Sequence, residues 1–104
     1  MEWHDNQELV DYIVQSIYNK FNIIALVDMY QRDAQIYFNT ALFKVIITLK
    51  FRSNDQQVYI SIYLADNHPR LKRDEFLNAY IASYDEIDDI IDQMAKYIRP
   101  YQLY

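Results

Sequence analysis

The chain contains no glycine in 104 residues. Glycine normally supplies backbone conformations with positive φ and allows a backbone to approach a phosphate closely. Its absence therefore excludes the glycine-rich loops of Walker-type and dinucleotide-binding sites, and the glycine-flanked serine of hydrolase nucleophile elbows. Among the remaining residues, asparagine and aspartate tolerate left-handed backbone best, so we expect them at the tight turns.

Length and composition are those of one folded domain, residues 1–104. Hydrophobic residues make up 52% of the chain, too many for a disordered segment. The chain has no cysteine, which excludes disulfides and thiolate metal sites and favours a reducing compartment. The start of the chain does not have the pattern of a signal peptide, and no apolar run approaches the ~20 residues of a membrane span. We therefore expect a soluble, cytoplasmic protein without a membrane partner.

An amphipathic helix is predicted over residues 6–20. Asp5 and Glu8 have the spacing of a capping box, in which one side chain accepts from the helix start and the other reaches back. Apolar residues then recur at helical spacing: Leu9, Val10, Ile13, Ile17 and Phe21.

Residues 23–64 change to the two-residue period of half-buried strands. The strongest alternation covers residues 42–52, and a second strand covers residues 58–64 after a hairpin loop at residues 53–56. Residues 23–30 and 35–39 are two further candidate strands, although the short apolar run of the first also fits a helix. Residues 67–69 contain Pro69 and are expected to end the sheet region.

Two helices are predicted at the C-terminal end. Residues 74–82 have the composition of a short helix, and Ser83 with Glu86 forms a second capping box. The last helix has its apolar stripe at Ile87, Ile90, Ile91, Met94 and Ile98, and Pro100 is expected to stop it. The predicted fold class is α+β: an N-terminal helix, an antiparallel meander of three to four strands, and two C-terminal helices packed on one sheet face.

The acidity of the chain belongs to its C-terminal part. The net charge is −5, and residues 74–92 contain seven acidic residues and no basic one. Four of them have the spacing that stacks side chains along one helix face: Asp85, Asp88, Asp89 and Asp92. This row fits a solvated helix face, a docking surface for a basic protein, or a divalent-metal site. The last is disfavoured because the ligands of hard cations usually converge from several directions.

Eleven of the residues are tyrosines. Tyrosine combines a rigid apolar ring with a polar tip, which suits both protein interfaces and the edge of a core. On the predicted meander, Tyr59 and Tyr63 share the outward face with Thr48 and its neighbours. The residues expected to contact a partner are those of this face, the acidic helix and the C-terminal tyrosines: Tyr59, Tyr63, Ile46, Lys50, Asp85, Asp88, Asp89, Asp92, Tyr101 and Tyr104.

No constellation typical of an enzyme occurs in the sequence. The two histidines, His4 and His68, fall at a chain end and in a loop. The basic cluster at residues 69–73 is followed by acidic segments that repel phosphate, so no direct nucleic-acid binding is expected. We expect no catalytic activity and no cofactor. A small metal-dependent enzyme that uses the acidic helix stays open as an alternative.

In size, acidity and its AT-rich type of composition, the chain resembles the small host-takeover inhibitors of phages that infect low-GC Gram-positive bacteria. Anti-CRISPR proteins and an inhibitor of the bacterial helicase loader are of this type. The resemblance implies a phage or mobile-element inhibitor in the cytoplasm of a bacterial host. Its partner would be a replication or defence enzyme, such as the helicase loader ATPase or a nuclease. The alternative partner is a second copy of the chain, in a homodimer closed by the Tyr/Ile sheet face.

Overall fold

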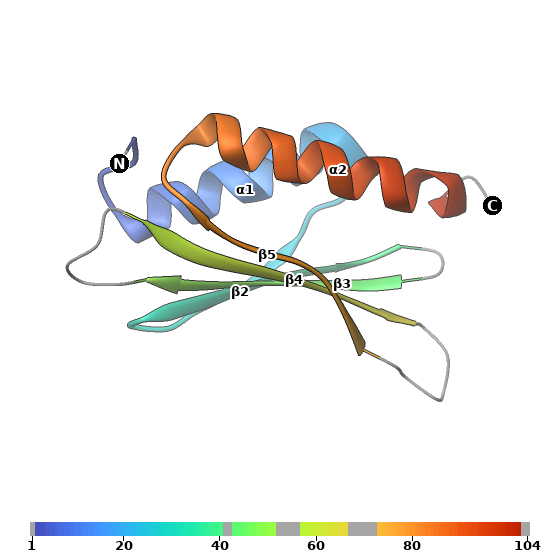
Figure 1. The fold of residues 1–104 in the computed structure, drawn as a ribbon, viewed down its shortest axis with the longest axis horizontal. Coiled ribbons are helices and arrows are strands. Elements are labelled where there is room, and N and C mark those ends of the chain that lie inside the picture. Colours follow the sequence, from blue (N-terminus) through green and yellow to red (C-terminus); the bar gives the residue numbers. More distant parts are fainter. Residues whose placement is uncertain (1, 41–42, 52–56, 67–72, 103–104) are drawn as a thin grey trace.

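The computed structural model describes residues 2–40, 43–51, 57–66 and 73–102, which form two layers (Figure 1). One layer is an antiparallel sheet in which five strands follow one another in sequence order. The strands are β1 (Leu26–Met29), β2 (Asp33–Asn39), β3 (Phe43–Phe51), β4 (Val58–Asp66) and β5 (Arg73–Ile81). The other layer contains α1 (Asn6–Phe21) and α2 (Tyr84–Gln102), which lie on the same face of the sheet. The predicted α+β class is therefore confirmed.

Both helices begin with the predicted caps. Asp5 accepts a hydrogen bond of 2.8 Å from the backbone N–H of Glu8. The Glu8 carboxylate reaches back to the N–H of His4, one residue before the cap, at 3.1 Å. Ser83 and Glu86 repeat this arrangement at the start of α2. Each cap satisfies backbone donors that the first turn of a helix leaves without an intrahelical partner.

Helix α1 ends on an asparagine in the left-handed conformation. Asn22 has φ 57° and ψ 37°, and its N–H donates to the carbonyl of Tyr18 at 2.8 Å. Glycine usually occupies this position because other residues pay a steric penalty there. The expectation that asparagine replaces glycine at such positions is confirmed here.

The core lies between the two layers. All apolar residues predicted for the faces of α1 and α2 are buried. Alternate residues of the strands point toward the helices and pack against these apolar residues, as the two-residue period predicts. These buried strand residues are Ala34, Ile36, Phe38, Val45, Ile47, Leu49, Val58, Ile60, Ile62, Leu64 and Ile81.

The prediction of a helix at residues 74–82 was wrong, because these residues belong mainly to β5. The register between β4 and β5 pairs Tyr63 with Glu75 and Ile62 with Leu77, so Phe76 is an extra residue. Such a bulge interrupts the two-residue period and leaves a pattern that also fits a helix. Without β5, the long strand β4 would be an unpaired edge of the sheet.

Three further predictions change with β5. The meander has five strands rather than three to four, one C-terminal helix follows it rather than two, and the sheet does not end at residues 67–69. Helix α2 also continues past Pro100 to Gln102. A proline removes one hydrogen bond and strains one turn, which weakens a helix without always ending it. The predicted hairpin loop at residues 53–56 lies outside the described residues.

The two helices run parallel to each other. Tyr84 at the start of α2 donates to Glu8 at the start of α1, and Tyr12 donates to Asp88 one turn further on. The four antiparallel pairings reverse the chain an even number of times between β1 and β5, so β5 runs in the direction of β1, and α2 leaves β5 in the direction of α1 (Figure 1). The strand that the sequence analysis missed therefore determines how the helices face each other.

The residues before α1 contact the start of α2. The Glu2 carboxylate accepts a hydrogen bond of 2.8 Å from the backbone N–H of Tyr84. Trp3 is 4% exposed, and its ring centroid lies 5.6 Å from that of Tyr84. The buried Nε1 of Trp3 has no hydrogen-bond partner among the described residues. These contacts connect the N-terminal residues to the start of α2.

Candidate functional site

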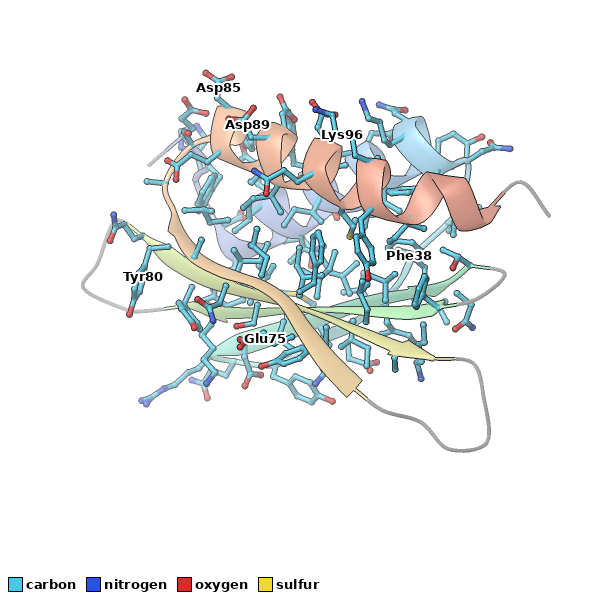
Figure 2. The ribbon with its side chains drawn as sticks, turned by 45° about the vertical axis from the view of Figure 1, so that its right-hand side comes forward. Phe38, Glu75, Tyr80, Asp85, Asp89 and Lys96 are labelled. Atoms are coloured by element: carbon cyan, nitrogen blue, oxygen red, sulfur yellow. The ribbon has the colours of Figure 1, made fainter. Side chains whose placement is uncertain are left out.

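No described helix covers the face of the sheet opposite α1 and α2 (Figure 2). We call it the open face. Strand residues that do not enter the core point to this side, because successive side chains of a strand alternate between the two faces. The open face therefore collects side chains from all five strands.

Strand register arranges the middle of the open face as a row of short polar side chains. Consecutive pairings connect one residue of each strand across the whole sheet. We call these residues the polar row: Asp28, Gln35, Thr48, Ser61 and Asn78. Ser61 is only 4% exposed although no described helix lies on this face. The floor of the row is therefore recessed between its neighbours.

Bulkier side chains form a row on each side of the polar row. One flanking row contains Leu26, Tyr37, Ile46, Tyr63 and Glu75. The other contains Tyr30, Asp33, Lys50, Tyr59 and Tyr80. Together the three rows make a shallow trough that crosses the strands.

Two hollows lie along this trough and share Gln35. The first has a volume of about 440 Å³ and is lined by Tyr30, Asp33, Ala34, Gln35, Thr48, Leu49, Lys50 and Tyr63. The second has a volume of about 280 Å³ and is lined by Asp28, Gln35, Tyr37, Lys44 and Ile46. Most of the side chains that line the two hollows are therefore tyrosines, residues with amide or hydroxyl groups, or charged residues of both signs.

Contacts within the open face hold its rings in place. Tyr59 and Tyr80 have ring centroids 5.0 Å apart and tilted by 56°. The ammonium group of Lys44 lies 5.7 Å from the centroid of Tyr37, a cation–π contact. The hydroxyl of Thr48 donates to the Ser61 carbonyl at 3.5 Å. Pre-positioned rings lose little conformational entropy when a partner binds.

The sequence analysis placed four of its candidate residues on this face correctly. The register pairs Ile46 with Tyr63 and Lys50 with Tyr59, so all four point the same way. Lys50 is exposed and the other three are partly exposed. Their contact with a partner stays a prediction.

Tyr37, Tyr80 and the members of the polar row other than Thr48 were missed. The alternation of residues 35–39 contained the signal for Tyr37, because it places that ring on the side opposite Ile36 and Phe38. Tyr80 could not be found, since its segment was predicted as a helix. The polar row depends on register between strands, which no single strand's pattern specifies.

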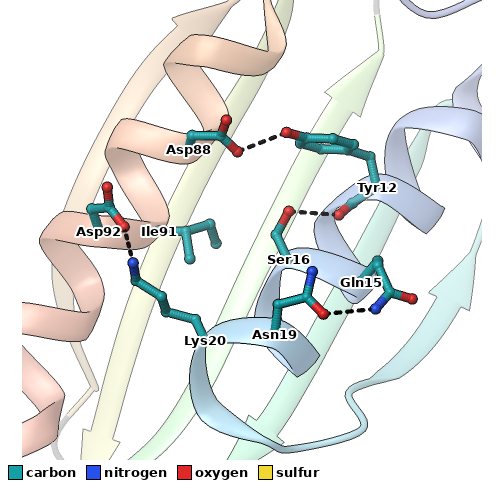
Figure 3. Close-up of a pocket in the computed structure, with 8 residues that line it drawn as sticks. All are labelled: Tyr12, Gln15, Ser16, Asn19, Lys20, Asp88, Ile91 and Asp92. Atoms are coloured by element: carbon teal, nitrogen blue, oxygen red, sulfur yellow. Dashed lines mark hydrogen bonds and ion pairs between the residues drawn. The ribbon is translucent and has the colours of Figure 1, made fainter.

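The acidic row of α2 divides into two pairs. Asp88 accepts a hydrogen bond of 2.7 Å from the Tyr12 hydroxyl, and Asp92 forms an ion pair with Lys20 (Figure 3). Both contacts cross a groove of about 380 Å³ between the helices. Asp85 and Asp89 lie on the outer side of α2 instead (Figure 2).

These contacts perturb two tyrosines at the helix interface. The hydrogen bond to Asp88, with burial and the negative charges of Asp88 and Asp85, raises the pKa of Tyr12 to about 12. Partial burial and a hydrogen bond to Glu8 likewise raise the pKa of Tyr84. Both hydroxyls therefore stay protonated donors throughout the physiological range. Asp88 and Asp92 hold the helix layer together, which makes them weaker candidates for a partner surface than Asp85 and Asp89.

The remaining candidates fall near or beyond the limits of the described structure. Tyr104 lies outside the described residues, and Tyr101 is within α2 with its side chain outside the description. Their neighbour Tyr97 is half exposed, and its ring packs 5.2 Å from that of Phe76. His4 is exposed, and His68 lies outside the described residues.

Within the described part of the chain, no three histidine, aspartate or glutamate side chains are grouped to hold a metal ion. Neither described helix is long and apolar enough to cross a membrane. Comparisons with protein-family models, with curated proteins and with solved structures found no match for this chain.

Proposed function

We propose that the protein is a protein-binding module whose open face docks a partner. The observation that carries the proposal is the trough, in which tyrosine-bearing rows flank a recessed polar row across an uncovered five-stranded sheet. Tyrosine rings supply apolar contact area, and the polar row supplies hydrogen-bonding groups for the partner's backbone or polar side chains.

The dimensions of the open face suit such a role. The five strands contain 4, 7, 9, 9 and 9 residues, and with a spacing of about 4.8 Å they cover roughly 600 Å². A stable protein–protein interface buries about 800 Å² on each partner. The open face can therefore supply most of one side of an interface without help from the helix layer.

The charges of the open face favour a protein over a nucleic acid. Asp28, Asp33 and Glu75 share this face with Lys44 and Lys50, so its charges nearly balance. Nucleic-acid surfaces instead concentrate basic side chains, because phosphate contacts dominate their affinity. The tyrosines of this face are of a residue type that is enriched in protein interfaces.

The kind of partner is a further part of the proposal. By resemblance to phage host-takeover inhibitors, the partner would be a host replication or defence enzyme, and binding would block its activity or assembly. No contact in the structure bears on this expectation, so it stays a prediction. Catalysis is not part of the proposal.

Capture with matched variants tests the proposal. The double variant Tyr59→Ala/Tyr63→Ala removes one ring from each flanking row, while Tyr18→Ala removes a tyrosine from the helix layer. Tyr18 is a close control because it is 45% exposed, as Tyr80 of the open face is. Each protein is immobilised, exposed to lysate of a low-GC Gram-positive bacterium, and its bound proteins are identified by mass spectrometry.

We expect one dominant protein with the unmodified chain and with Tyr18→Ala, and its loss with the double variant. Circular dichroism checks that the double variant is folded, because it removes two partly exposed rings and the Tyr59–Tyr80 ring contact, which itself contributes about 1 kcal/mol. Equal capture by all three proteins refutes the role of the open face. If the unmodified chain sediments as a dimer and the double variant as a monomer, the open face serves self-association instead.

A further inference from the structure

The edge strand β1 combines unpaired backbone with exposed apolar side chains. Among the described residues, no strand pairs with the outer side of β1. Seven large hydrophobic side chains of the described chain are exposed, and four of them lie within residues 24–30. These are Ile24 at 77%, Leu26 at 60%, Tyr30 at 58% and Met29 at 40%. An edge with these properties is a template for another strand.

The register identifies which backbone groups of β1 are available. The N–H of Tyr30 donates to the carbonyl of Asp33, so this pair is hydrogen-bonded. Hydrogen-bonded pairs alternate along an antiparallel ladder, which makes Asp28 and Leu26 the next residues bonded to β2. The N–H and C=O groups of Val27 and Met29 therefore point outward, away from β2.

The opposite edge of the same sheet is protected. Strand β5 contains the bulge at Phe76, which increases local twist and interrupts the edge. Its exposed Glu75 carboxylate accepts a hydrogen bond of 2.8 Å from the Asn78 amide along the strand. By contrast, β1 has a regular register, no lysine and no proline. The protection of β1 is limited to its length of four residues and the charge of Asp28, which leaves its backbone groups and apolar side chains open to a short extended segment.

A second copy of the chain is a poor occupant for this edge. A strand of four residues is only about 13 Å long, so pairing two copies through β1 buries much less than the roughly 800 Å² per partner of a stable dimer. Each copy also carries a net charge of −5, which opposes association. At β1 itself, the exposed Asp28 carries the only charge of the strand, which favours a basic side chain in the partner.

We propose that β1 binds an extended, basic segment of a partner protein as an added sixth strand of the sheet. The segment would pair with the outward N–H and C=O groups of Val27 and Met29. On the open-face side, a lysine or arginine would stand beside the exposed Asp28, flanked by apolar side chains beside Leu26 and Tyr30. Strand addition of this kind draws affinity from main-chain hydrogen bonds and specificity from alternate side chains.

The inference goes beyond the proposed role of the open face, because it concerns the edge of the sheet and can be tested separately. Met29→Pro deletes one outward N–H and leaves the hydrogen bonds between β1 and β2 intact, since proline is tolerated where the amide faces solvent. Met29→Val changes the side chain but keeps the amide and is the matched control. Asp28→Lys reverses the charge without touching the backbone.

A displayed library of random twelve-residue peptides is selected on the immobilised, unmodified protein. We expect enriched peptides that alternate apolar residues with at least one lysine or arginine. These peptides should bind Met29→Val as well as the unmodified chain and Met29→Pro at least about tenfold more weakly, a loss of 1.4 kcal/mol. Selection on Asp28→Lys should enrich acidic peptides instead. The double variant Tyr59→Ala/Tyr63→Ala should retain the peptides.

Hydrogen exchange measured by NMR provides the direct readout, because bound peptide should slow the exchange of the Val27 and Met29 amides. The proposal is overturned if no peptide is enriched, if the enriched peptides bind Met29→Pro equally well, or if Asp28→Lys selects the same peptides. It is also overturned if the unmodified chain sediments as a dimer that Met29→Pro converts to a monomer, since the occupant is then a second copy. Trp3 fluorescence and circular dichroism verify that each variant is folded.

Discussion

Replacing Tyr12 by phenylalanine removes a single hydroxyl group from the interface between α1 and α2. That hydroxyl donates to Asp88 at 2.7 Å, while the Tyr12 ring lies 4.1 Å from the ring centroid of Tyr84. Phenylalanine keeps the ring contact and removes only the hydrogen bond. The variant therefore isolates the contact through which Asp88 of the acidic row contributes to the fold.

The expected loss of stability follows from the exposure of the two partners. A hydrogen bond to a charged group contributes about 1.5–3 kcal/mol when it is buried. Tyr12 is partly exposed and Asp88 is exposed, so water replaces the lost donor and we expect a loss of about 1 kcal/mol. With an unfolding entropy of about 2.1 cal/mol/K per residue, a chain of 104 residues should lose about 5 °C in Tm.

A double-mutant cycle of Tyr12→Phe and Asp88→Asn, measured by urea unfolding, checks this value. We expect a coupling energy near 1 kcal/mol, because each single variant removes the same charged hydrogen bond. The cycle Tyr12→Phe with Asp89→Asn is the control, since Asp89 lies on the outer side of α2 and should show no coupling (Figure 2). A coupling below about 0.3 kcal/mol for the first cycle refutes the reasoning, because additivity at independent sites already holds within that range.

The same contact predicts a dependence on alkaline pH. The pKa of Tyr12 rises from 10.0 to about 12 in the folded protein. Below pH 10 the hydroxyl is protonated in both states and its stabilisation is fully present. Between pH 10 and 12 the unfolded state loses the proton first, so stability decreases as pH rises. The stability difference between the unmodified chain and Tyr12→Phe should therefore be constant from pH 7 to 9 and shrink above pH 10. A difference that stays constant to pH 11.5 contradicts the assignment.

Three further variants test the packing and the turns. Ile47→Ala, at a fully buried position of the central strand, should lower the free energy of unfolding by about 2–5 kcal/mol in urea. Asn22 is in the left-handed region, so Asn22→Gly should change the free energy of unfolding by only about a few tenths of a kcal/mol. Asn22→Val should cost at least about 1–2 kcal/mol. Equal effects of the two variants contradict the role of backbone conformation. Trp3→Phe should lower the free energy of unfolding by less than about 1.5 kcal/mol, since it removes a buried N–H that has no partner among the described residues. Trp3→Ala should lower it by about 3–5 kcal/mol. Thermal unfolding distinguishes the two variants.

The open face and the β1 edge present different chemistry to a partner. The open face offers tyrosine rings around a recessed polar row, whereas the edge offers backbone hydrogen-bonding groups beside apolar side chains. Asp28 belongs to both, because it is the end of the polar row and the only charge in β1. A partner segment added to β1 would therefore lie at the mouth of the trough. A triple variant that combines Met29→Pro with Tyr59→Ala and Tyr63→Ala can show whether one partner uses both surfaces.

The sequence by itself determined the features that depend on neighbours within a few residues. The caps at Asp5 and Ser83 follow from side chains that reach backbone amides three residues away. The buried stripes of both helices and the faces of β3 and β4 follow from periods of 3.6 and 2.0 residues. For the same reason, Ile46, Lys50, Tyr59 and Tyr63 could be placed on one face before the sheet was known. The absence of glycine also predicted asparagine or aspartate at tight turns, and Asn22 occupies such a position.

Only the tertiary structure decided the features that depend on which segments meet. The segment of β5 has a mixed period because of its bulge, and pairing with β4 resolved it as a strand. Asp88 and Asp92 looked equivalent to Asp85 and Asp89 until α1 was placed beside α2 and supplied Tyr12 and Lys20. The polar row and the exposed β1 edge depend on the register and the order of the strands. All these features have the same physical reason. Contacts between distant segments depend on the packing of the whole chain, which cannot be predicted from the periodicity of side chains within one segment.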